Sequence, residues 1–401
     1  MSQTASGSAP AASGTLGRLA GWYFFYFAFV GAFAPYFTLY LQDIGQTPWE
    51  IGVLMSVPQV MRLLAPNLWG WLADHLGRPA LIVRFAALFS ALGFVGFLLS
   101  KDYVWMLVAM ALVWFFWSAA LPLVETMTLN QLVGKTERYG RVRVWGSVGF
   151  IVSVLGLGMI LDHWPVAAVL WACIAILGCV FASALTLPEA KVGAGETAEP
   201  LGPLLQRPAV LALLASCFFM SVAHGPLYVF FSIHLVEHGY GKTAIGLYWS
   251  LGVVAEIVVF LVMARLMRHF SLRAILLASF ALAVLRFLMI GWMADSPVLL
   301  VIAQVLHGAT FGAHHAGAMA VLTHWFAPRQ QARMQGLYGS LSFGAGGLVG
   351  GLLSGQTWGS LGGGMTYTLA ALFAAVGGLL LWRWLPTVLM PIRPIPPAAA
   401  P

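Results

Sequence analysis

Long apolar runs follow one another along nearly the whole chain, and short polar segments separate them. Each run is continuous for about 20 residues, which is the length that a tilted helix needs to cross a bilayer. Strands of a membrane barrel would instead alternate over about ten residues. The pattern predicts twelve membrane-spanning helices, at residues 19–42, 50–73, 79–100, 104–130, 144–162, 166–187, 209–236, 244–266, 274–294, 297–325, 334–355 and 365–385.

One longer polar segment, 188–208, divides these helices into two sets of six. We therefore expect an all-α membrane protein with an N-terminal bundle over 18–187, a linker over 188–208 and a C-terminal bundle over 209–385. The two ends, 1–17 and 386–401, are rich in small residues or proline, so we expect disordered tails.

Composition excludes a soluble domain. The chain is 60% hydrophobic and 8% charged, whereas soluble domains carry about 25% charged residues. In the bilayer core only helices and closed barrels satisfy their own backbone, which leaves a helical membrane protein. The sequence also lacks a Walker A motif, a carboxylate pair for acid–base work and a Ser/His/Asp arrangement, so we expect neither an enzyme nor an ATP-driven pump.

Basic residues gather on one side of the predicted membrane. Only Lys101 and Lys242 lie on the other side, and the positive-inside rule therefore predicts cytoplasmic termini and a cytoplasmic linker. The net charge of +7 then reflects topology, and no nucleic-acid partner is expected. The predicted cytoplasmic residues are Arg18, Arg78, Lys135, Arg138, Arg141, Lys191, Arg207, Arg265, Arg268, Arg273, Arg329, Arg333, Arg383 and Arg393.

The two halves carry an internal repeat. The segment LQDIGQTPWEIGVL (41–54) aligns without a gap on LVEHGYGKTAIGLY (235–248), and the same offset lays DHLGRPAL on RHFSLRAI. The aligned pairs are Leu41/Leu235, Asp43/Glu237, Gly45/Gly239, Ile51/Ile245 and Gly52/Gly246. Such a repeat predicts two pseudo-symmetric bundles with a substrate site between them, as in many transporters.

The stretch GWLADHLGRPALIVR places Gly70, Asp74, Gly77 and Arg78 between two apolar runs. It resembles the loop between spans 2 and 3 of the major facilitator superfamily, which the chain resembles throughout its twelve predicted spans. Gly77 would permit a tight turn, Gly70 a close helix approach, and Asp74 a helix cap or a pair with a cation. The resemblance implies a gate latch on the cytoplasmic side; the alternative is a solvated turn.

Few ionisable residues lie within the predicted spans, where a charge costs at least about 2.5–3.5 kcal/mol and is a functional candidate by default. They are Arg62, Glu125, Arg143, Glu256 and Arg286. The repeat offset relates Arg62 to Glu256, which predicts similar depth and a shared cavity, where either Arg62 or Arg143 would suit a substrate carboxylate. We expect Glu256 to be the protonatable group, with Arg286 as its partner. The alternative is a static ion pair that fixes helix packing.

Histidines add further candidates. Gly225-Pro226 should break or kink the span that holds His224 and Tyr228, and we include both of these residues in the substrate site. His307 lies in a later span. A membrane histidine either bonds neighbouring helices or relays a proton, and no histidine spacing suggests a metal site.

Two further stretches resemble the oligosaccharide:proton symporters, which include lactose permease. They are Pro122-Leu-Val-Glu125 and YGRVRVWGSVGF (139–150). The resemblance implies that Glu125 and Arg143 bind substrate while Phe150 packs on it.

The same resemblance places Arg286 and His307 in a proton-coupling network. However, Thr310 stands where that family has its coupling carboxylate, so coupling would pass to Glu256.

A closer resemblance is to the phenylpropionate-permease-like branch, through SVAHGPLYVFFSIHL and LHGATFGAHHAG. It implies proton-driven import of a small organic acid by a monomer without cofactor, in a bacterial cytoplasmic membrane. The aromatic first span could line a cavity or serve only in packing. The alternatives are a sugar or nucleoside symporter, an efflux antiporter, which the absence of proline from 144–162 disfavours, and a transport-inactive sensor.

Overall fold

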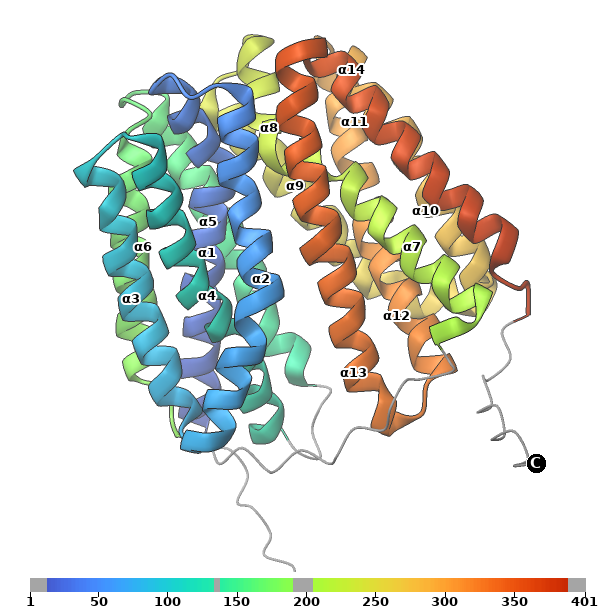
Figure 1. Cartoon of the computed structure of the whole chain (residues 1–401), viewed down its shortest axis with the longest axis horizontal. Coiled ribbons are helices and arrows are strands. Elements are labelled where there is room, and N and C mark those ends of the chain that lie inside the picture. Colours follow the sequence, from blue (N-terminus) through green and yellow to red (C-terminus); the bar gives the residue numbers. More distant parts are fainter. Residues whose placement is uncertain (1–12, 133–137, 190–204, 389–401) are drawn as a thin grey trace, which may run out of the picture.

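Six helices form the described part of the first half of the protein. The computed structural model describes residues 13–132, 138–189 and 205–388. The first half comprises α1 (Ser13–Asp43), α2 (Pro48–Leu76), α3 (Pro79–Leu99), α4 (Tyr103–Gln131), α5 (Tyr139–Leu161) and α6 (Ala168–Leu185). These helices lie together on one side of the molecule (Figure 1). Each matches one predicted span to within a few residues.

The second half is more broken. It comprises α7 (Pro208–Ala223), α8 (Gly225–Glu237), α9 (Lys242–His269), α10 (Leu272–Trp292), α11 (Pro297–His307), η3 (Gly308–Ala313), α12 (His314–Trp325), α13 (Pro328–Gly339), η4 (Ser340–Gly346) and α14 (Gly347–Trp384). The predicted span 209–236 is divided at His224, as the Gly-Pro pair indicated. The span 297–325 contains the π-helix η3, which the pattern did not predict.

Eleven helical stretches of the described residues are long and apolar enough to cross a membrane. The last, Arg333–Trp384, has 52 residues, or about 78 Å at 1.5 Å per residue, which is far more than one crossing requires. Gly362 interrupts it with φ 79°, and Figure 1 shows the two arms of α14 running in opposite directions. This stretch holds the last two predicted spans, 334–355 and 365–385.

The internal repeat is visible in the backbone. Gly45 and Gly239, which the repeat aligns, have φ of 88° and 80° and are the second residues of the loops that follow α1 and α8. Only glycine adopts this left-handed conformation at little cost. The repeat therefore rests on a shared turn geometry as well as on matching residues.

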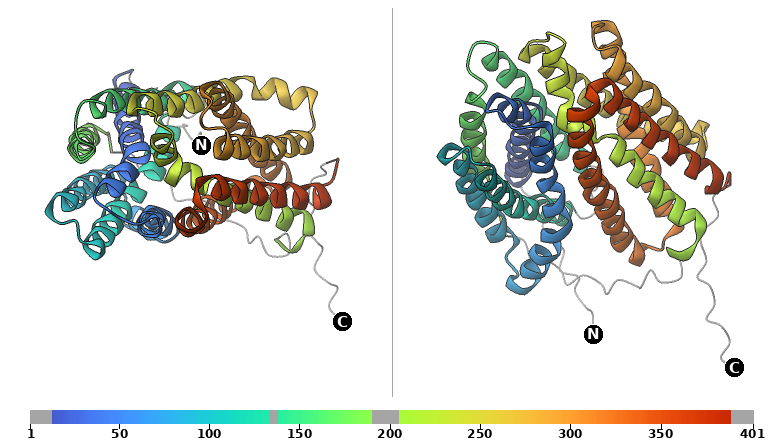
Figure 2. Two further views of the ribbon diagram at one scale, coloured as in Figure 1. Left: turned by 90° about the horizontal axis from the view of Figure 1, so that it is seen from above. Right: turned by 45° about the horizontal axis from the view of Figure 1, so that its top comes forward.

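The two groups of helices touch mainly at one end. At this end lie the loops 44–47 and 238–241, and we call it the closed end. Figures 1 and 2 show the ribbons of α1–α6 and α7–α14 converging there and separating toward the other end. A Cβ added to Gly52 of α2 would lie 2.7 Å from Gly355 Cα of α14. Backbones this close require glycine on both sides.

Aromatic side chains of α1 form much of the first bundle's core. Trp22, Phe29 and Phe33 are buried, and the ring of Phe29 lies 4.6 Å from that of Trp117 on α4. The aromatic first span therefore serves mostly in packing, and Phe27 is its aromatic residue in the cavity wall described below.

The segment boundaries differ from the prediction at the N-terminus. Helix α1 begins at Ser13, so residues 13–17 of the predicted tail are helical; Leu16 packs against the core and extends the helix. The rest of that tail, together with 190–204 of the linker and 389–401, lies outside the described residues.

Candidate functional site

A cavity of about 310 Å³ lies between the two groups of helices. Its wall contains Phe27, Val30, Arg143, Ser147 and Phe150 from the first group and Leu227, Tyr228, Trp249, Gly252, Val253, Glu256, Arg286, Gln304, His307 and Phe311 from the second. Its volume suits a small organic molecule, and its mixture of aromatic faces with few polar groups is typical of ligand sites.

Close helix packing brings α9 against α11 and η3. A Cβ added to Gly308 would lie 2.6 Å from the Ala255 carbonyl oxygen, and one added to Gly252 would lie 3.2 Å from the His307 ring. His307 is the last residue of α11, directly before the π-helix, and such π segments are frequent at functional sites. The two glycines and the irregular backbone place the His307 ring beside Glu256.

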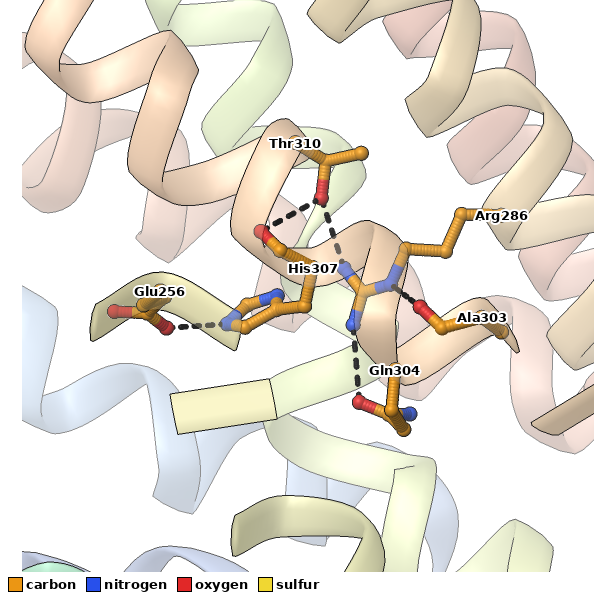
Figure 3. A network of polar contacts seen from close by, with 6 residues as sticks. All are labelled: Glu256, Arg286, Ala303, Gln304, His307 and Thr310. Carbon is orange, nitrogen blue, oxygen red and sulfur yellow. Dashed lines mark hydrogen bonds and ion pairs between the residues drawn. The ribbon is translucent and has the colours of Figure 1, made fainter. Parts of the chain in front are cut away.

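Glu256 and His307 form a direct pair, with His307 Nε2 2.7 Å from Glu256 Oε1 (Figure 3). Their side chains are 20% and 8% exposed, so the carboxylate reaches the cavity while the imidazole is nearly enclosed. At this distance one proton lies between the two atoms, on either partner. The prediction that Glu256 pairs with Arg286 was wrong, because Arg286 is bound elsewhere.

Arg286 is fully buried and points toward α11 and η3. Its Nε donates to the Ala303 carbonyl at 2.8 Å, and its terminal nitrogens donate to Thr310 Oγ1 at 3.2 Å and Gln304 Oε1 at 3.4 Å (Figure 3). All three acceptors are neutral. Thr310, where the resembling family has a carboxylate, thus holds the arginine through its hydroxyl. Gln304 was missed by the sequence analysis, although an amide within an apolar run was a usable signal.

The first bundle contributes Arg143, whose guanidinium lies against aromatic rings. The Arg143 guanidinium lies 4.0 Å from the centroid of the Phe27 ring and 5.6 Å from that of Tyr23. Such cation–π contacts are worth about 0.5–2 kcal/mol. Helix α5 begins at Tyr139, so Arg143 lies a full turn inside the helix rather than at its start. Phe150 lines the same wall, as the resemblance implied.

Three other predicted binding residues lie apart from this wall. Glu125 is not among the lining residues, and its carboxylate accepts a long hydrogen bond of 3.5 Å from the Tyr139 hydroxyl. Arg62 is exposed and is not a lining residue of this cavity, but it lies within electrostatic range of the wall residue Tyr228, so a space shared by Arg62 and Glu256 stays a prediction. A repeat offset fixes depth along a helix, whereas a long flexible side chain chooses its own direction.

The third is His224, which stands at the break between α7 and α8. Its Nδ1 lies 2.8 Å from the Met220 carbonyl, and the ring lines a smaller cavity of about 30 Å³ inside the second bundle. Tyr228 borders both cavities and therefore lies between them.

The predicted latch is only partly formed. Gly77 ends α2 with φ 61°, and its N–H donates to the Ala73 carbonyl, so the tight turn is confirmed. The close approach expected at Gly70 was wrong: a Cβ there would meet nothing within 4 Å, because the bundles separate toward this end. Asp74 is exposed and does not cap α3, which begins after Arg78 without a side-chain cap. Its gating role stays a prediction.

Known proteins resemble the chain over most of its length. A 3-phenylpropionic acid transporter, named as probable, of Escherichia coli is 30% identical over 370 residues, covering 87% of this chain and 92% of that protein. A maltose permease of Geobacillus stearothermophilus is 29% identical over 343 residues, covering 82% and 86%.

Solved structures share the fold. A mutant of the nucleoside transporter NupG superposes with a TM-score of 0.84 at 16% identity, covering 93% of this chain and 100% of that one. An inward-facing bacterial homologue of the lysosomal transporter Spinster gives 0.69 at 14% identity, covering 94% and 97%. The model of the MFS_1 like family matches residues 16–369. The chain therefore belongs to the MFS_1 like family of the major facilitator superfamily, and it is a multi-pass membrane transporter rather than an enzyme.

Proposed function

We propose that the protein imports a small aromatic carboxylate together with protons. One observation carries this proposal: a single cavity has, on one wall, an arginine that lies against aromatic faces and, on the other wall, the Glu256–His307 pair. The similarity to a probable 3-phenylpropionic acid transporter supports the same substrate class.

The wall of Arg143 suits a carboxylate. A charged hydrogen bond from a guanidinium is roughly twice as strong as a neutral one, and Arg143 has no carboxylate partner within the described residues. An entering carboxylate would therefore gain an anionic contact in exchange for a weaker contact with the Phe27 ring. Phe150, Trp249 and Phe311 offer flat apolar surface to an aromatic substituent.

The wall of Glu256 suits a proton carrier. Its carboxylate reaches the cavity and shares one hydrogen-bonded proton with His307. We infer that the proton enters this pair when the cavity is open to the outside and leaves it when the cavity is open to the cytoplasm. With the termini cytoplasmic, as the positive-inside rule indicates, the closed end faces outward. One chain supplies both walls, so a monomer suffices, and the proton gradient drives transport without a cofactor.

The test uses purified protein in proteoliposomes with an imposed pH gradient and a panel of phenylpropionate, other aromatic acids, disaccharides and nucleosides. Glu256→Gln should abolish gradient-driven accumulation while counterflow exchange continues, because a neutral amide still fits the cavity but cannot release a proton. Glu50→Gln, at the start of α2, is the matched control, since glutamine also serves in a capping box.

Each outcome of this experiment distinguishes the proposed function from one of its alternatives. Normal accumulation by Glu256→Gln would exclude that residue as the coupling group. Transport of disaccharides or nucleosides alone would favour the sugar or nucleoside symporter, a candidate supported by the maltose permease relative. Accumulation only under the reversed gradient would indicate an efflux antiporter. If no compound of the panel is transported, the transport-inactive sensor becomes the favoured hypothesis.

A further inference from the structure

The first residues of α2 and α9 occupy matching positions in the two repeats, yet their backbones are capped in different ways. Thr47 precedes α2, and its hydroxyl accepts the Glu50 N–H at 3.3 Å while the Glu50 carboxylate accepts the Thr47 N–H at 2.8 Å. This reciprocal capping box satisfies the start of α2 from within its own helix.

Helix α9 has lost both side chains of that box. The repeat offset that aligns Gly45 with Gly239 places Gly241 opposite Thr47 and Ala244 opposite Glu50. Neither residue can accept a hydrogen bond through its side chain, and Gly241 indeed provides no cap. The first N–H groups of α9 would otherwise lack partners within the helix.

A carboxylate from the opposite bundle takes over this role. Asp162, at the end of α5, accepts the Lys242 N–H at 2.6 Å through Oδ1 and the Thr243 N–H at 3.0 Å through Oδ2. A carboxylate at a helix start is also favoured by the helix dipole. The bond thus joins the two bundles directly at the closed end.

The matching interface between α2 and α14 lacks such a bond. A Cβ on Gly158 of α5 would lie 2.6 Å from the Lys242 carbonyl, and a Cβ on Gly355 of α14 would lie 2.8 Å from the Pro48 carbonyl, so the two glycines make equivalent contacts. Four residues later, α5 has Asp162 whereas α14 has Gly359. Moreover, Pro48 has no N–H to donate. Only one of two similar interfaces therefore carries the carboxylate.

We propose that Asp162 is a latch between the bundles, which caps α9 across the interface and favours the conformation closed at this end. Opening this end must separate α5 from α9, and it then leaves the Lys242 and Thr243 N–H groups without their acceptor. The Tyr36 hydroxyl reinforces the same contact, since it lies 2.7 Å from the Val154 carbonyl and 3.1 Å from the Lys242 carbonyl. The latch does not depend on the substrate or on proton coupling.

The hydrogen bonds of Asp162 with the start of α9 persist near neutral pH. Partial burial raises the pKa of Asp162, but hydrogen bonds from the side chain and N–H of Thr243 and from the N–H of Lys242, with the Lys242 ammonium, bring the pKa below its ordinary value. Because the pKa of Asp162 is lowered, the bonds of its carboxylate stabilise the closed conformation fully at any pH above the ordinary aspartate pKa. This stabilisation is lost only when the pH falls through the lowered pKa. A proton is therefore not the trigger for release.

The experiment measures the distance between spin labels at Lys101→Cys and Met293→Cys, two positions near the closed end on opposite bundles. It uses the full chain in nanodiscs without substrate, and the background variants Cys173→Ala, Cys179→Ala and Cys217→Ala leave only the labelled cysteines. Asp162→Ala should shift the equilibrium toward the longer, open distance by about 5- to 30-fold, the size expected for one lost cap. Asp162→Asn, which keeps one acceptor oxygen, should shift it less.

The control is Thr47→Ala, which removes the side-chain cap of the matching helix at an exposed position outside the contact between Pro48 and Gly355. It should leave the distances unchanged. Adding Gly241→Ser to Asp162→Ala supplies α9 with a cap of its own; this should restore thermal stability but not the closed population. Unchanged distances in both Asp162 variants, or full recovery of the closed population by Gly241→Ser, would show that Asp162 is an ordinary helix cap and overturn the proposal.

Discussion

The two walls of the cavity hold their charges in opposite ways. On the first bundle, Arg143 lies against the faces of Phe27 and Tyr23, and its charge keeps hydrogen-bonding capacity for a ligand. On the second bundle, Glu256 is bound to His307, and Arg286 has three neutral acceptors. Arg143 lies against aromatic faces and can turn toward an entering anion, whereas Arg286 must break three hydrogen bonds before it can move. The difference suggests that the first wall recognises substrate and the second stores the proton.

The strongest test of this division is Arg143→Gln. If Arg143 binds the carboxylate, its loss removes a charged contact worth about 1.5–3 kcal/mol, which corresponds to roughly 10- to 150-fold weaker binding. Arg143→Lys should recover part of the affinity, since it keeps the charge but loses the fork-shaped donor set. Binding is measured by calorimetry on the detergent-solubilised protein.

An Arg143→Gln variant that binds aromatic carboxylates like the parent would break the comparison, because substrate recognition would then lie on the second wall. The same measurement on Glu256→Gln should show little loss of affinity at a pH where the parent is coupled. The pair of variants thus assigns binding and coupling to separate walls.

The next test concerns Arg286. Gln304→Leu removes one of its acceptors from a fully buried position, so the free energy of unfolding should fall by about 1–3 kcal/mol. Thr310→Ser retains the hydroxyl that accepts from Arg286 and should cost less. Both are measured by thermal unfolding in detergent. Equal stability of Gln304→Leu and the parent would show that Arg286 is not held by this network.

The sequence predicted the helices well because the length of each apolar run is by itself enough to indicate a membrane-spanning helix. It predicted the Gly-Pro break at His224 and the tight turn at Gly77 for the same local reason. The partners of the charged residues could not be derived in this way. The Glu256–His307 pair depends on how closely α9 approaches η3, which is set by Gly308 against the Ala255 backbone.

Asp162 shows the same limit from another direction. In the sequence it is one charge at the end of an apolar run, which topology alone explains. Its role emerges only when the end of α5 and the start of α9 are seen together. Its two hydrogen bonds join residues 80 and 81 positions apart, so neither periodicity nor the repeat offset could reveal them.

The smallest effect on substrate affinity is expected at Phe27. It tests whether the Phe27 ring competes with the substrate for Arg143. Phe27→Leu keeps the wall apolar but removes the cation–π contact, worth about 0.5–1 kcal/mol at an accessible site. The substrate then no longer has to displace that contact, so affinity for an aliphatic carboxylate should rise by about 2- to 5-fold. Phe150→Leu is the control, because Phe150 lines the cavity without contacting Arg143 in a cation–π geometry. It should weaken binding of aromatic acids and leave aliphatic acids unaffected. If Phe27→Leu instead weakens the aliphatic acid, the ring orients Arg143 for binding rather than competing with the substrate, and the first wall would be as preorganised as the second.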